Sequence, residues 1–159
     1  MVPVIAKQDL ALSDAVTGYV SSLEGAFALL GAVVLARMAR PASFRKIYYY
    51  GMLGHLGAVF FVGMVPGLLP LTIGLIAAGS CAACFSTMQS TLIYSVAPPE
   101  MRGRLLGLMT ICIGTGVIGF ANVGITAELF GAANAVWIIA LEGIVPMVII
   151  GWKWRELNT

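Results

Sequence analysis

The chain has 159 residues, of which 60% are hydrophobic and only 10% are charged, with a formal net charge of +2 and a mean hydropathy of +0.97. Soluble domains average about 25% charged residues, so this chain cannot cover a globule with polar surface, and its composition predicts a protein that lies in a lipid bilayer. The small net charge and the lack of a long basic tract argue against a nucleic-acid partner.

Five segments are long and apolar enough to cross a bilayer, which needs about 20 residues of helix. In chain order they cover residues 16–36, 47–65, 70–95, 104–126 and 133–151. Ser13 or Asp14 is suited to cap the first helix, and Pro70 is suited to the first turn of the third. Pro146 predicts a kink in the fifth. The predicted fold class is therefore an all-α membrane protein with five transmembrane helices.

Basic residues gather on alternate connections between these spans. The connection 37–46 contains four basic residues and no acid: Arg37, Arg40, Arg45 and Lys46. Residues 97–104 contain two arginines against one glutamate, and the tail contains Lys153 and Arg155 against Glu156. The intervening connections, 66–69 and 127–132, contain one charged residue, Glu128. The positive-inside rule then predicts a multi-pass protein of the cell membrane whose start lies outside and whose C-terminus is cytoplasmic.

Small residues recur at helical spacing in the third and fourth spans. The third span has the rows Gly74, Ala78, Ala82, Ser86, Ser90 and Gly79, Ala83, Thr87, Thr91; the fourth span has Gly103, Gly107, Gly114, Gly116, Gly119 and Gly124. Because lipid offers no hydrophobic drive for helix association, such rows favour close backbone packing. Both spans are expected to pack among other helices.

Three cysteines, Cys81, Cys84 and Cys112, lie inside apolar runs. Neither a redox CxxC nor a zinc site fits these surroundings, so we interpret them as small packing residues. No catalytic residue, metal site or cofactor is predicted.

Three polar residues within the spans are candidates for substrate contact or proton coupling: Glu24, Gln89 and Asn122. A charge near the middle of a membrane is costly, so Glu24 is expected either to face a cavity and exchange protons or to be a protonated structural carboxyl. Gln89 and Asn122 are uncharged and are placed nearer the membrane surfaces, where hydrogen bonding between helices is the main alternative.

His55 and Glu142 also fall near the centres of their spans, the second and the fifth. If those two helices touch, the residues could satisfy one another at matched depth. We therefore predict an intramembrane structural pair.

Residues 97–107 interrupt the apolar sequence with Pro98, Pro99, Glu100, Arg102, Gly103 and Arg104. The prolines end the third span, and the arginines hold the turn in the cytoplasm. This stretch resembles the P-x-E-x-R-G-R-x-x-G loop between the tenth and eleventh helices of major facilitator superfamily exporters, particularly the enterobactin-exporter-like branch. The run Gly114-Thr115-Gly116 resembles the glycine-rich run of the helix that follows.

The connection 36–46 lies where that family places its second G-x-L-A-D-R-x-G-R-R loop. It departs from the pattern, because Ala36 stands for the glycine, Arg40 for the aspartate and Ser43 for the second glycine. The charge relay attributed to the aspartate is therefore not expected here.

The resemblance implies that residues 1–159 form most of the C-terminal six-helix half of a major facilitator fold, helices eight to twelve, with residues 1–6 ending helix seven. It implies a proton-coupled exporter of small amphipathic molecules in a bacterial inner membrane. Pro98, Glu100, Arg102, Gly103 and Arg104 would form a cytoplasmic gating loop. The N-terminal half would be missing, so the chain would be a fragment or truncation that cannot perform alternating access alone.

Two other classes of function are weighed against transport. The small-residue rows fit a membrane scaffold or assembly subunit that acts through helix packing. An intramembrane enzyme finds little support, because the chain has one histidine and no G-x-S-x-G or H-E-x-x-H motif.

Overall fold

The computed structural model describes residues 12–154. The helices are α2 (Asp14–Met38), η2 (Pro41–Ser43), α3 (Phe44–Met64), α4 (Leu68–Val96), α5 (Pro99–Gly114), α6 (Gly116–Phe130) and α7 (Ala132–Lys153). Within the described residues, five helical units are long and apolar enough to cross a membrane, with α5 and α6 together forming the fourth. This confirms the predicted all-α membrane fold. The predicted end of helix seven at residues 1–6, and the tail charges Arg155 and Glu156, lie outside the described residues.

The first helix starts as its sequence indicates. Ser13 is the N-cap, and its hydroxyl accepts a hydrogen bond from the backbone N–H of Val16 at 3.4 Å. Asp14 follows in the first turn, where a carboxylate is favoured by the helix dipole.

The third span begins two residues earlier than predicted, at Leu68. Gly67, with φ of 138°, makes the turn that only glycine adopts without strain, and Pro70 then falls within the first helical turn. The helix ends at Val96, and Pro99 opens α5.

The fourth span is two helices rather than the single helix predicted for residues 104–126. α5 ends at Gly114 and α6 starts at Gly116, so Thr115 forms the junction. The Thr115 N–H bonds to the carbonyls of Ile111 and Ile113, and its hydroxyl donates to the Cys112 carbonyl at 2.6 Å. Glycines on both sides weaken the helix at this point, and the Thr115 hydroxyl occupies the Cys112 carbonyl in its last turn.

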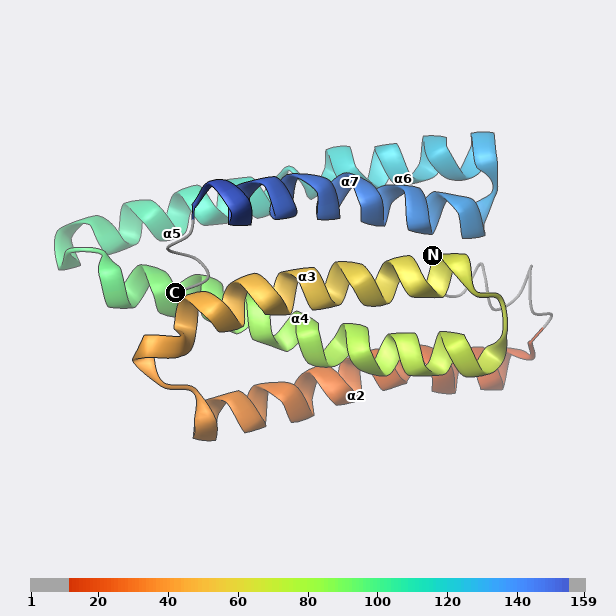
Figure 1. The fold of residues 1–159 in the computed structure, drawn as a ribbon, viewed down its shortest axis with the longest axis horizontal. Helices are drawn as coiled ribbons and strands as arrows, with labels where there is room; N and C mark the ends of the chain where they lie inside the picture. Colours follow the sequence, from red (N-terminus) through yellow and green to blue (C-terminus); the bar gives the residue numbers. More distant parts are fainter. Residues whose placement is uncertain (1–11, 155–159) are drawn as a thin grey trace.

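Figure 1 shows the helices running side by side along the long axis of the molecule. α4 packs against both α2 and α3, α3 packs against α7, and α7 packs against α6. The core cluster lies where the start of α4 meets α2 and α3, and consists of Val20, Val62, Leu71 and Leu75. α7 continues through Pro146 to Lys153.

The basic connections lie at one end of the molecule. In Figure 1 the α2–α3 connection, the α4–α5 connection and the end of α7 lie towards the left, whereas the α3–α4 and α6–α7 connections lie towards the right. This arrangement is the alternation that the charge distribution requires.

Candidate functional site

Two polar side chains from neighbouring spanning helices, α6 and α7, are hydrogen-bonded to each other. The Asn122 side-chain amide donates a hydrogen bond to Oε2 of Glu142 at 2.8 Å. Thr126, one turn further along α6, donates its hydroxyl to Oδ1 of Asn122 at 3.4 Å. The three side chains form a hydrogen-bonded row that ends on the carboxylate.

Asn122 is level with the middle of α7, because its partner Glu142 lies there. α6 extends to Phe130, beyond the end predicted at residue 126.

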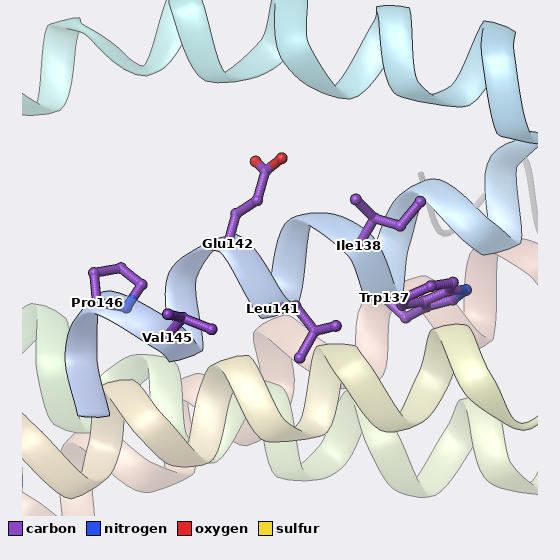
Figure 2. A pocket seen from close by; sticks show the side chains of 6 residues that line it. All are labelled: Trp137, Ile138, Leu141, Glu142, Val145 and Pro146. Atoms are coloured by element: carbon purple, nitrogen blue, oxygen red, sulfur yellow. The ribbon is translucent and has the colours of Figure 1, made fainter. Parts of the chain in front are cut away.

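Glu142 borders a groove of about 450 Å³ along α7. The other lining residues are apolar: Trp137, Ile138, Leu141, Val145 and Pro146. Figure 2 shows the Glu142 side chain pointing from α7 towards α6, with Leu141 pointing away from α6. The Trp137 indole N–H is occupied, because it donates to Oδ1 of Asn134 at 3.0 Å. A carboxylate beside an otherwise apolar groove can take up a proton or a cation.

Glu24 lies in a different part of the structure, on the face of α2 that meets α4. The backbone of Glu24 touches Gly79 so closely that a Cβ at position 79 would collide with it. The Glu24 side chain is half-buried.

The three residues predicted to contact substrate or protons are not brought together. Glu24 is on α2, Gln89 on α4 and Asn122 on α6. Gln89 is ten residues along α4 from Gly79, about 15 Å of helix rise from the contact with Glu24. α2 and α6 lie at opposite sides of the helix array in Figure 1. Asn122 joins Glu142, which had been assigned to a structural pair.

The predicted pairing of His55 with Glu142 is wrong, because each of the two residues has a different partner. Nδ1 of His55 lies 3.0 Å from the carbonyl oxygen of Ala78 on α4, and its ring centroid is 5.5 Å from that of Phe85. α3 and α7 do touch, but next to His55 the residue that contacts α7 is Leu56, against Gly143. Because successive helical residues point about 100° apart, His55 turns to α4 when Leu56 faces α7, and Glu142 turns to α6.

Arg102, in the predicted gating loop, contacts residues at the end of α4, within the turn that joins α4 to α5. Its Nε donates to the carbonyl of Ala97, the C-cap of α4, at 3.1 Å, and its guanidinium lies 5.9 Å from the centroid of the Tyr94 ring. Pro98 caps α5, and Glu100 lies in its first turn. Gly103 and Arg104 are exposed. The contacts that the structure gives Arg102 stabilise the turn between α4 and α5.

The basic connection between α2 and α3 has four exposed side chains: Arg37, Arg40, Arg45 and Lys46. Arg37 is in the last turn of α2, where the helix dipole favours a cation. Arg45 and Lys46 are in the first turn of α3, where the dipole disfavours one. The helix dipole therefore does not explain why Arg45 and Lys46 stand at the start of α3.

Sequence reasoning missed Thr126 and the apolar lining of the groove. Asn122 and Thr126 are four residues apart, which places them on one helix face and could have marked the row. Within the described residues, no group of three His, Cys, Asp or Glu side chains could hold a metal ion.

A family model described as Major Facilitator Superfamily matches residues 1–158. The chain belongs to the Major Facilitator Superfamily. No curated protein and no solved structure gave a significant match.

Membership of this superfamily, together with the five apolar helical units, makes the chain a transporter-type segment of a multi-pass membrane protein. Members of the superfamily bind small-molecule substrates and are generally not enzymes. The family match does not favour the scaffold hypothesis.

Proposed function

We propose that this superfamily chain is part of a secondary active transporter that exports small amphipathic molecules in exchange for protons. The observation that carries the proposal is the Glu142 carboxylate, bonded to Asn122 beside the apolar groove of α7. Glu142 is exposed in the described structure although it lies mid-helix in an apolar span. Such a charge costs about 3 kcal/mol in lipid, so this face is expected to line a cavity that water and substrate can enter.

The proposal assigns two carboxylates to the transport cycle. Glu142 binds and releases the proton next to the groove, and Asn122 orients the carboxylate by its hydrogen bond. Glu24 remains a second proposed proton site, since it is half-buried on α2. In this proposal residues 1–159 are the C-terminal part of an exporter of the enterobactin-exporter-like branch in a bacterial inner membrane. The N-terminal half of the transporter is not among these residues. The basic connections and the C-terminus are cytoplasmic.

The test is proton-driven efflux from vesicles that contain the transporter with both halves. An amphipathic fluorescent dye is the substrate, and an imposed pH gradient is the energy source. Glu142→Gln should reduce the gradient-driven rate at least 10-fold, and Glu24→Gln should lower it as well. Glu128→Gln, at an exposed position near the end of α6, is the matched control and should transport normally. Normal efflux by Glu142→Gln would remove this site from the coupling mechanism.

A further inference from the structure

The α2–α3 connection carries positive charge that its own contacts leave unused. Arg37, Arg40, Arg45 and Lys46 fall within the segment 37–46, which contains no acid, and all four side chains are exposed. Within residues 12–154, none of these four side chains makes a hydrogen bond or an ion pair. Arg45 and Lys46 also stand at the positive end of the α3 dipole, where a cation is disfavoured. These charges are therefore available to an anionic partner.

The turn between α4 and α5 uses its charges differently. Arg102 donates a hydrogen bond to the Ala97 carbonyl and lies beside the Tyr94 ring, so its guanidinium is engaged within the chain. Glu100, in the first turn of α5, offsets one positive charge of this turn. The α2–α3 connection has neither an internal partner for its cations among the described residues nor an acid of its own.

A further cation comes from the last turn of α7. The ring of Tyr49 on α3 lies so close to the backbone of Gly151 that a Cβ at position 151 would collide with it. This contact places the end of α7, with the exposed Lys153, beside the start of α3. Figure 1 shows the end of α2, the start of α3 and the end of α7 at the same end of the molecule. We call this surface the basic end; it consists of Arg37, Arg40, Arg45, Lys46 and Lys153.

Apolar and aromatic side chains are exposed on the same three helices next to these cations. They are Val34 and Met38 on α2, Tyr50 on α3, and Ile149 and Trp152 on α7. Tyrosine and tryptophan are favoured where the hydrocarbon of a bilayer meets its headgroups. A ligand at the basic end can therefore place an anionic group among the cations and an apolar body along the helices. A small free anion would use the cations only.

From this charge complementarity and its apolar continuation, we propose that the basic end binds the phosphate headgroup of an anionic phospholipid, whose acyl chains lie along the exposed sides of the helices. Basic clusters next to a spanning helix attract such headgroups. The partner is a lipid and not the transported molecule, so the inference does not depend on the export proposal. It selects anionic over zwitterionic phospholipids.

The test measures which lipid lies next to Trp152 in the full chain reconstituted into phosphatidylcholine vesicles. The other two tryptophans are removed as Trp137→Phe and Trp154→Phe. Bromine on the acyl chains quenches a tryptophan at close range, so a small fraction of brominated lipid reports local enrichment. Brominated phosphatidylglycerol should be enriched at least about 5-fold over brominated phosphatidylcholine, and high salt should reduce this preference. Equal quenching by the two lipids would overturn the inference.

Substitutions separate this site from the net charge of the molecule. Arg45→Gln and Lys46→Gln should each lower the preference for phosphatidylglycerol by up to about 5-fold, the effect of one cation beside an anionic headgroup. Arg104→Gln is the matched control, because it removes an exposed cation from the other basic turn, and it should leave the preference unchanged. Arg45→Lys keeps the charge and should keep the preference. An equal loss in Arg104→Gln, or a loss in Arg45→Lys as large as in Arg45→Gln, would contradict the assignment.

A soluble competitor distinguishes a lipid site from a site for free phosphate. Glycerophosphoglycerol is the headgroup of phosphatidylglycerol without its acyl chains. At millimolar concentration it should leave the quenching of Trp152 by brominated phosphatidylglycerol unchanged, because it cannot use the apolar surface of the helices. Displacement of the lipid by this competitor would mean that the basic end binds phosphate esters in solution, and would overturn the lipid assignment.

Discussion

The third and fourth spans contain similar rows of small residues, but the structure uses them differently. α4 buries seven residues, namely Leu71, Gly74, Leu75, Ala78, Gly79, Ala83 and Met88, whereas α5 buries none and α6 buries only Thr126. A Cβ added at Gly74 or Gly79 would collide with a neighbouring helix. A Cβ added at any of the fourth-span glycines would meet no atom of the described residues within 4 Å.

The contrast shows what a glycine row can and cannot predict. Helical spacing of small residues creates a surface on which another backbone can approach closely. Whether that surface is occupied depends on the neighbours that the chain supplies. Among the described residues, α4 has α2 and α3 as close neighbours, while α5 and α6 contact chiefly α7 and the end of α4.

The largest difference between the two spans is expected when the same methyl group is added to a glycine of each. Gly79→Ala forces the new Cβ against the Glu24 backbone, which cannot rotate away as a side chain can. We expect the free energy of unfolding to fall by about 3 kcal/mol, which is the upper end of the costs typical of overpacked sites. Thermal unfolding of the purified chain in detergent measures it.

Gly119→Ala on α6 is the matched control for this change. It should be neutral or slightly stabilising, because alanine is the better helix former and nothing crowds the position. Equal losses for Gly79→Ala and Gly119→Ala would mean that the fourth span is as tightly packed as the third.

The polar contacts of the fourth span offer a second, smaller test. A double-mutant cycle with Asn122→Val and Glu142→Gln should give a coupling energy of about 0.6–1.7 kcal/mol, typical of interhelical hydrogen bonds in membranes. A cycle with His55→Phe and Glu142→Gln should give about zero, since His55 bonds to Ala78 on α4. The reverse pattern would restore the pair predicted from sequence.

The turn between the two spans can be tested with its two arginines. Arg102→Ala removes the hydrogen bond to the Ala97 carbonyl and the contact with the Tyr94 ring, and should cost about 1 kcal/mol of stability. Arg104→Ala, which removes an exposed side chain from the same turn, should change stability by less than about 0.5 kcal/mol. Equal effects would argue that both arginines act only through net charge.

The smallest expected effect concerns two hydroxyls on α2 near the start of α4. Thr17 and Ser21 have buried oxygens with no hydrogen-bond partner among residues 12–154, unlike Ser22, which donates to the Tyr19 carbonyl at 2.8 Å. Thr17→Val should therefore raise the melting temperature by about 1–3 °C, because it replaces an unsatisfied hydroxyl with a methyl group. Ser22→Ala, which removes a satisfied hydroxyl, should not raise it. A lower melting temperature for Thr17→Val would reveal a partner for that hydroxyl.

Much of the fold could be predicted because it depends on local composition. The five apolar helical units and the Ser13 cap follow from hydropathy and capping rules. The junction at Thr115 was missed because a glycine pair within an apolar run is also compatible with one continuous membrane helix. Its position depends on the hydrogen bonds to Ile111 and Cys112.

The site was harder to predict because it depends on which helix each side chain faces. Depth alone suggested pairing His55 with Glu142. His55 and Leu56 are consecutive residues that point in different directions from α3, and it is Leu56 that faces α7. The Asn122 contact also requires knowing that α6 and α7 are neighbours. Hydropathy gives the depth of a residue but does not give its azimuth on the helix.

The central claim is that the helices cross one bilayer with their basic connections on the same side. Single cysteines at Ser43, Arg104 and Glu128, in a chain whose native cysteines are replaced by serine, would be labelled with a membrane-impermeant maleimide. Positions 43 and 104 should react from the same side of the membrane and position 128 from the other. Labelling of positions 43 and 104 from opposite sides would contradict it.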